Sequence, residues 1–191
     1  MASALMHLYV GNKFVTRHGR ITDLSQFFLG CILPDWGETK DIRWLSHFRS
    51  NDIDEWYNNN LDFYWCNVGS VNNDFLLGYI LHNITDAAFD KHLNLKSRDY
   101  CFDYDQRNET WWKNDVLPVL NKADSTEISK INKILAVMYS DEIIVNVPSI
   151  QRIVDYSNTS YPDGTPALVT IEMMDELSDI VYKIVTDAIK I

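Results

Sequence analysis

The chain has 191 residues, of which 46% are hydrophobic and 13% aromatic, and its formal net charge is −10. This length and composition predict one globular domain with a sizeable core and exclude a disordered chain. The acidic balance argues against a nucleic-acid-binding surface and against tight docking on an anionic membrane, because both need positive charge.

The cysteines and the N-terminus predict the cellular setting. An odd number of cysteines, at positions 31, 66 and 101, suggests reduced thiols inside a cell. The stretch MASALMHLYVGNKF lacks the basic region and cleavable apolar core of a signal peptide. No apolar run approaches the length of a transmembrane helix. These features predict a soluble cytoplasmic protein.

The first helix is expected over residues 3–17, with Ser3 as its N-cap and Gly19 closing it. His7 shares a stripe with apolar residues of this helix, so it is expected to face inward. His18 lies at the polar end of the helix and is expected to be exposed.

A short apolar helix is expected over residues 23–33. Pro34 is expected to end it, because proline disfavours helix in the preceding residue, and Asp35 then lies in a loop. An aspartate after proline is usually a turn residue. The following run, DIRWLSHFRS, places His47 among aromatic and aliphatic side chains, where a histidine can be a plain core residue.

Residues 52–66 are predicted to form a helix with Asn51 or Asp52 as its cap. This helix carries a surface of aromatic side chains: Trp56, Tyr57, Phe63, Tyr64 and Trp65. The surface either packs onto the central helix, which is the commoner arrangement, or forms one wall of a substrate cleft.

The most apolar segment runs from Asp74 to Leu93 and is predicted to form one long helix. Apolar residues cover most of its circumference, which is typical of a buried helix. His82 and Asp86 lie one turn apart on the same stripe. Because a buried carboxylate needs a cation or strong donors, the pair is either a hydrogen-bonded core pair, the commoner case, or part of a metal site.

The rest of the chain is predicted to contain a polar loop after Leu93 and then three longer helices. These are expected over residues 108–122, with a kink at Pro118, 125–140 and 169–190. A short helix and a turn-rich loop are expected over 141–168. The fold prediction is all-α, with residues 1–191 in a single compact domain around the buried 74–93 helix.

The candidate site residues are dispersed along the chain. It contains no H-E-x-x-H, paired C-x-x-C, Gly-rich phosphate loop or G-x-S-x-G, and it lacks the adjacent His-Asp doublet of HD-type phosphohydrolases. What remains is a set of histidines and aspartates, mostly in apolar contexts: His7, Asp35, His47, His82 and Asp86, followed by His92.

The order of these residues resembles the bacterial zinc-dependent phospholipase C family. The matching segments lie within residues 1–95: SALMHLYVGNK, FFLGCILPD, SHF and FLLGYILHNITDAAFDKH, the last with an H-x3-D-x5-H pattern. The resemblance implies an all-α fold that hydrolyses phosphoesters with a cluster of zinc ions. It also implies that Asp86 bridges two metals and that His7 binds the second. The first metal would be completed by Asp35, His47 and His82.

Two features depart from that family. Its secreted members use a mature N-terminal Trp as a ligand, whereas this chain starts at Met1 and has no signal whose removal would expose a Trp. Their third zinc takes a further His and, four residues later, a Glu, but no His follows His92 here. Asp105 and Glu109 have a similar spacing, so they are candidates, with His92, for an additional metal. His92 lies about 80° around the helix from His82, so it would face a different site.

The leading hypothesis is a metal-dependent phosphoester hydrolase with one or two zinc ions, although manganese or iron also fits. Two ions about 3.5–4 Å apart polarise a phosphoryl oxygen and activate a bridging water. Asp35 would ligate or act as general base, a catalytic role. The expected substrate is a small-molecule or lipid-like phosphoester, and the missing export signal and acidic charge disfavour phospholipid itself. The alternative is a non-catalytic protein of the same fold with a structural metal or none.

Overall fold

The computed structural model describes residues 4–37, 39–92, 112–140, 145 and 169–190. Within these ranges the chain forms eight α-helices, one 3-10 helix and one π-helix, and no strand. The all-α prediction is therefore confirmed for the residues that the structure describes. None of the helices described has both the length and the apolar character that crossing a membrane requires.

The helix bounds agree with the sequence predictions for four of the longer elements. In chain order the elements are α1 (Ala4–His18), α2 (Leu24–Gly30), η1 (Leu33–Trp36), α3 (Lys40–Ser46), α4 (Ile53–Asn67), α5 (Asn73–His92), η2 (Trp112–Val116), α7 (Leu117–Leu120), α8 (Thr126–Tyr139) and α10 (Ile171–Ile189). The predictions at 3–17, 52–66, 125–140 and 169–190 match α1, α4, α8 and α10 to within two residues at either end.

The ends of α1 and α4 show why these bounds could be predicted. Gly19 follows α1 with a left-handed φ of 63°, a conformation that glycine adopts without strain. Asp52 caps α4, because its side chain accepts hydrogen bonds from two backbone N–H groups of the first turn.

The prediction that His18 is exposed is wrong. His18 is half-buried, with its ring 5.3 Å from that of Phe14.

The prediction around Pro34 is also wrong. The second helix ends at Gly30, and Asp35 lies within η1 instead of a loop. Pro34 occupies the first turn of η1. A residue there needs no N–H for the helix, so proline begins an element here instead of ending one.

The middle of the chain is described only in part. The helix expected over 108–122 is present there as η2 followed by α7. Pro118 lies in the first turn of α7, so the π and α segments meet next to it. The loop expected after Leu93 lies outside the described residues, as do the elements expected within 141–168, where Val145 alone is described. The single domain over 1–191 stays a prediction.

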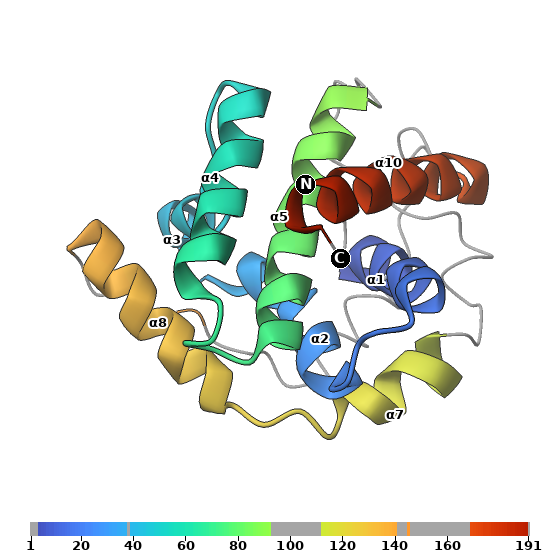
Figure 1. Cartoon of the computed structure of the whole chain (residues 1–191), viewed down its shortest axis with the longest axis horizontal. Helices are drawn as coiled ribbons and strands as arrows, with labels where there is room; N and C mark the ends of the chain where they lie inside the picture. Colours follow the sequence, from blue (N-terminus) through green and yellow to red (C-terminus); the bar gives the residue numbers. More distant parts are fainter. Residues whose placement is uncertain (1–3, 38, 93–111, 141–144, 146–168, 191) are drawn as a thin grey trace.

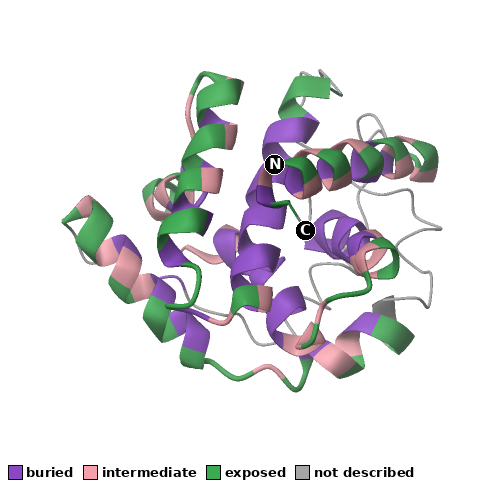
Figure 2. Ribbon diagram, viewed as in Figure 1, coloured by how far each residue is buried: buried purple, intermediate pink, exposed green. Residues whose placement is uncertain are grey.

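α5 lies at the centre of the helices described (Figure 1). Every residue from Phe75 to Phe89 is buried, and Figure 2 shows this part of α5 in purple. The helices α1, α2, α4 and α10 all contact it. Asn72 fixes its start, because Oδ1 of Asn72 accepts hydrogen bonds from the N–H groups of Asp74 and Phe75. The prediction of a buried central helix is therefore confirmed.

The closest approach to α5 is made by α2, through two glycines. A Cβ atom added to Gly30 would lie 2.2 Å from the carbonyl oxygen of Phe75, and one added to Gly78 would lie 2.1 Å from that of Phe27. The two backbones therefore touch at this crossing. The crossing also sets the distance between α5 and Cys31, the residue that directly follows α2. The carbonyl oxygen of Cys31 accepts a hydrogen bond from His82 of α5.

We expect Gly78→Ala to lower the free energy of unfolding by about 3 kcal/mol, the upper part of the usual range for overpacking, because the atom that a Cβ would meet is backbone. Gly11→Ala is the matched control, since its Cβ would meet side chains only, the nearest being Sγ of Cys31 at 3.0 Å. Denaturant unfolding of both variants measures the difference. A Gly78→Ala loss no larger than the Gly11→Ala loss would contradict the close crossing.

Candidate metal centre

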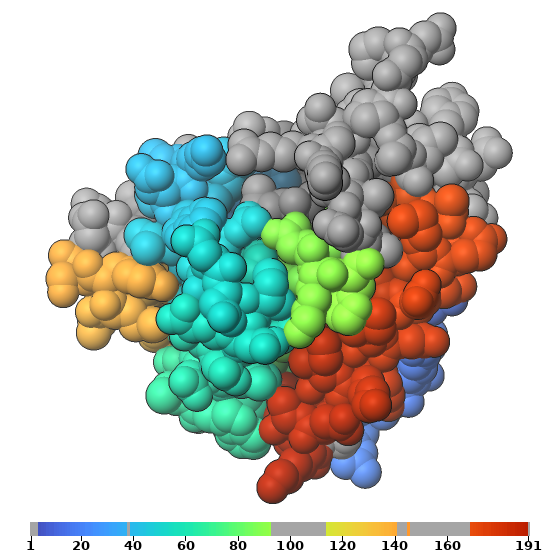
Figure 3. Space-filling view, turned by 90° about the horizontal axis from the view of Figure 1, so that it is seen from above, coloured from blue at the N-terminus to red at the C-terminus, as the bar shows by residue number. Residues whose placement is uncertain are grey.

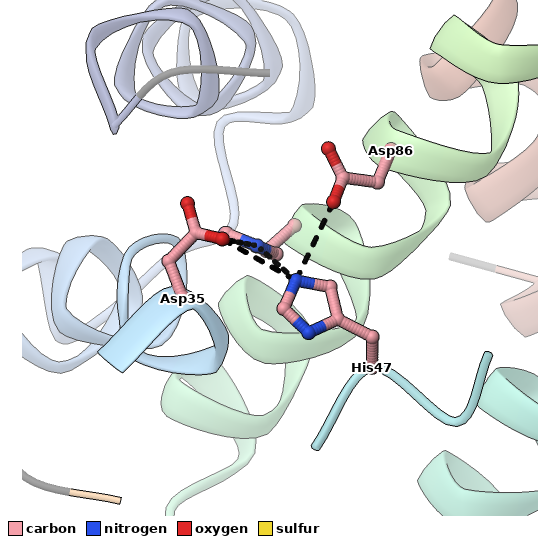
Figure 4. A group of neighbouring side chains, drawn as sticks. Asp35, His47 and Asp86 are labelled. Carbon is pink, nitrogen blue, oxygen red and sulfur yellow. Dashed lines mark hydrogen bonds and ion pairs between the residues drawn. The ribbon is translucent and has the colours of Figure 1, made fainter. Parts of the chain in front are cut away.

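Five side chains from four parts of the fold meet beside α5. His82 and Asp86 belong to α5, His7 to α1 and Asp35 to η1, whereas His47 follows the last residue of α3. Four of the five are almost completely buried, and Asp35 is the exception, with 20% of its side chain exposed. Figure 4 shows Asp35, His47 and Asp86 pointing toward one another, with dashed lines meeting at the His47 ring.

Four donor atoms of this cluster lie close to one another. Nε2 of His47 lies 3.1 Å from Nε2 of His82, 3.5 Å from Oδ1 of Asp35 and 3.4 Å from Oδ2 of Asp86. One donor atom of each of these four residues lies within 4.8 Å of the other three. A tetrahedral ion with ligands at about 2.0–2.1 Å places them about 3.3–3.4 Å apart. The four residues could therefore hold a metal ion.

Backbone carbonyls orient both imidazoles of this group. Nδ1 of His82 donates to the carbonyl oxygen of Cys31 at 2.7 Å, and Nδ1 of His47 donates to the carbonyl oxygen of Arg43. These bonds place a proton on each Nδ1 and leave each Nε2 lone pair for a ligand. The two Nε2 atoms lie 3.1 Å apart, a distance that suits either a proton shared between them or an ion bound by both.

The other oxygen of each carboxylate faces His7. Nε2 of His7 lies 3.4 Å from Oδ1 of Asp86 and 4.0 Å from Oδ2 of Asp35. Its ring stacks on that of His82, with centroids 3.5 Å apart. Neither nitrogen of this ring makes a hydrogen bond within the part of the chain described. Each carboxylate thus presents one oxygen to the pair His47 and His82 and one to His7, as two ions that share carboxylates would need.

The pKa values of the cluster show where charge collects in the absence of an ion. Burial raises the pKa of Asp86, but His47 and His7 lower it more, so it lies well below its ordinary value. Burial lowers the pKa of His47, but the bonds to Asp35 and Asp86 outweigh it and raise the pKa to about 9. Burial, with the neighbouring His7, lowers the pKa of His82 to about 3. Without an ion, the cluster therefore holds a proton on His47.

We expect the ion-free protein to lose stability as pH rises from 6.5 to 9. The folded pKa of His47, about 9, lies above its ordinary value of 6.5. Protonated His47 therefore contributes its full stabilisation below pH 6.5, and this contribution is lost as the pH rises to 9 and above. The free energy of unfolding should fall by roughly 3 kcal/mol over this range. A bound ion replaces that proton, so the ion-loaded protein should vary less over this range. Melting temperatures of chelated and loaded samples between pH 6 and 9 measure both slopes, and equal slopes would contradict the assignment.

His92, one of the three residues proposed for an additional metal, does not join this cluster. His92 is the last residue of α5 and is exposed, and Figure 3 shows that end of α5 at the surface between α4 and α10. It lies about 15 Å along the helix axis from His82. Among the residues described, no group of three potential ligands includes His92. Asp105 and Glu109 lie outside the described residues, so the additional site stays a prediction.

The aromatic surface of α4 mostly packs into the core. Trp56, Phe63 and Tyr64 are buried, whereas Trp65 is 54% exposed. Phe63 also lines a groove of about 740 Å³ between α3, α4 and α8, but none of the five cluster residues lines it. The packing interpretation therefore holds for three of the aromatic residues, and a substrate cleft stays a prediction.

The groups that orient the two imidazoles could not be identified from the sequence. The acceptors at Cys31 and Arg43 are backbone carbonyls, which every residue type has, so the side chain gives no signal. The four-residue spacing between Arg43 and His47 is the one clue, because it allows a bond back to the preceding helical turn.

Comparison with known proteins does not extend what the geometry shows. The interpretation of the cluster therefore depends on its own distances, burial and hydrogen bonds. Searches with protein-family models, against curated proteins and against solved structures found no match to this chain.

Proposed function

We propose that the protein is a metal-dependent hydrolase that cleaves phosphoesters. One ion would be held by Asp35, His47, His82 and Asp86, and a second by His7 together with Asp35 and Asp86. The main support is that one donor atom from each of Asp35, His47, His82 and Asp86 lies within 4.8 Å of the other three, so that the four could hold an ion. The phosphoester class comes from the resemblance to the zinc-dependent phospholipase C family. Zinc fits these donors, and manganese or iron also fits.

The roles proposed for Asp35 and Asp86 follow from how far each is exposed to solvent. Bound divalent ions would supply Lewis-acid polarisation of a phosphoryl oxygen and a more acidic water. Asp86 is fully buried, so its charge is weakly screened and offsets that of the ions. Asp35 is the cluster residue with solvent access, which puts the approach for water and substrate on its side. Its Oδ2 could accept a proton from water or ligate the second ion.

A non-catalytic protein with a structural metal is the second candidate. This candidate is favoured by the number of donors around the first proposed ion. Four protein donors can complete a tetrahedron and leave no coordination position for water. Three of those four residues are also almost completely buried. The two candidates differ in turnover, not in metal binding.

Hydrolysis of a generic phosphodiester by zinc-loaded protein tests the proposal. We expect turnover that a chelator abolishes and added zinc or manganese restores, and that Asp35→Asn lowers by about 10²–10⁴-fold if Asp35 is the base. His92→Ala, which changes an exposed histidine outside the cluster, is the control and should keep its rate. Protein that binds the ion but turns over neither phosphomonoesters nor phosphodiesters would favour the structural candidate.

A further inference from the structure

The backbone turn that carries His47 has an unusual end. The N–H of Phe48 donates to the carbonyl of Leu45 at 3.0 Å, and that of Arg49 donates to the carbonyl of Trp44 at 3.4 Å. This pair of bonds is a Schellman motif, in which the residue after the cap adopts a left-handed conformation and is usually glycine. Here Phe48 occupies that position, with φ of 52°. A residue with a Cβ is strained in this conformation, so the surroundings must hold it.

Two side chains of α5 bind the turn from one side. The carbonyl oxygen of Ser46 accepts hydrogen bonds from the hydroxyl of Tyr79 at 2.8 Å and from Nδ2 of Asn83 at 3.2 Å. Both donors are fully buried. Water that would usually satisfy a helix C-terminus is therefore replaced by side chains here.

Two side chains of α4 bind the next carbonyl. The carbonyl oxygen of His47 accepts from Nε1 of Trp56 at 2.7 Å and from Nδ2 of Asn60 at 3.3 Å. Oδ1 of Asn60 in turn accepts from Nδ2 of Asn83 at 2.8 Å, which joins the two helices. We call these four donors the carbonyl frame: Trp56, Asn60, Tyr79 and Asn83.

The spacing on α5 connects this frame to the cluster. Tyr79, His82, Asn83 and Asp86 follow the i, i+3, i+4, i+7 pattern of a single helix face. The helix that supplies two cluster residues thus also holds the turn that supplies His47. An apolar residue at position 60 or 83 could fill the same volume, but it would leave buried carbonyls with fewer donors.

We infer that the carbonyl frame positions His47 as a metal ligand. By holding the carbonyls of Ser46 and His47, it keeps the strained turn in place and keeps Nε2 of His47 facing Nε2 of His82. The metal part of this inference rests on the proposed function. Groups that orient a ligand from outside the coordination sphere typically contribute about 10–100-fold in metal affinity.

Zinc affinity of Asn60→Leu against a matched control, Asn67→Leu, tests the inference. Both asparagines are buried in α4 and donate to the carbonyl four residues earlier, at 2.9 Å to Trp56 and 2.8 Å to Phe63. Only Asn60 belongs to the frame. We expect Asn60→Leu to bind zinc about 10–100-fold more weakly than the parent and Asn67→Leu to stay within about threefold of it. With Co²⁺ in place of zinc, the visible absorption spectrum should change in Asn60→Leu alone, because it reports coordination geometry.

The outcomes separate this inference from the proposed function. A folded Asn60→Leu with parental affinity and spectrum overturns the inference and leaves the proposed function standing. Zinc binding weakened equally in Asn67→Leu overturns it too, because the loss would then follow from replacing any buried asparagine of α4. A parent that binds neither zinc nor Co²⁺ overturns both. If Asn60→Leu does not fold, the zinc affinity of Trp56→Phe tests the inference instead, because this change removes one donor and keeps a large ring. Zinc binding about two- to tenfold weaker than that of the parent supports the inference, and parental zinc binding overturns it.

Discussion

Asp86→Asn is expected to abolish ion binding and to lower the melting temperature more than any other single change in the cluster. Oδ2 of Asp86 lies 3.4 Å from Nε2 of His47, and Oδ1 lies 3.4 Å from Nε2 of His7, so it serves both halves of the site. Asparagine keeps the volume but removes the charge that offsets the cations. Breaking a buried charge pair costs about 3–5 kcal/mol, or roughly 6–20 °C for a chain of this size.

Three measurements on Asp86→Asn and on His92→Ala check this expectation: metal content, turnover of a generic phosphodiester and melting temperature. His92→Ala should resemble the parent, because His92 is exposed at the end of α5. Retention of metal and activity by Asp86→Asn, with their loss in His92→Ala, would show that the shared carboxylate is wrongly assigned. If neither variant nor the parent holds metal, His82 and Asp86 belong to a buried hydrogen-bonded cluster only.

Removal of the ions by a chelator is expected to have the second largest effect. An ion present at 100 to 1,000 times its dissociation constant stabilises the folded state by about 3–4 kcal/mol, so its removal should lower the melting temperature by roughly 6–16 °C. The physical reason is that the buried Asp86 and the partly exposed Asp35 would lose the cations that offset their charge and retain only the proton on His47.

Asp86→Asn provides the control for the chelator experiment, since it should already lack the ions and respond little. Zinc added back to the chelated parent should restore the original melting temperature. A chelator effect of the same size in the parent and in Asp86→Asn would mean that the stabilising ion binds elsewhere.

Periodicity predicted the centre of the fold because α5 is apolar on nearly all sides. The predicted range, 74–93, differs from the observed helix, Asn73–His92, by one residue at each end. The same periodicity placed His82 and Asp86 on one face, and both face the cluster. These features are local, so sequence spacing is sufficient to predict them.

Features that depend on distant contacts could not be predicted in this way. The contact between Gly30 and the backbone of α5 joins segments far apart in sequence, and a helical glycine alone does not reveal its neighbour. The placement of Asp35 was wrong, because proline can begin a helical turn as readily as it ends one. The hydrogen bond from Asn60 to the turn was missed because its acceptor is the backbone carbonyl of His47, just past the end of α3.

The candidate site itself came partly from residue chemistry and partly from family resemblance. Apolar surroundings marked His7, His47 and His82 as buried histidines, and all three are buried. Sequence spacing could not predict that these histidines lie beside Asp35 and Asp86, because it does not fix how the loops between the segments run. It was expected from the order of the residues in the zinc-dependent phospholipase C family.

Elemental analysis of protein purified without added metal measures whether the cluster of Asp35, His47, His82 and Asp86 holds an ion. We expect one or two equivalents of a divalent transition metal per chain, such as zinc, and their loss in Asp86→Asn. A parent with only traces of such metals, even after incubation with zinc followed by desalting, would contradict this expectation.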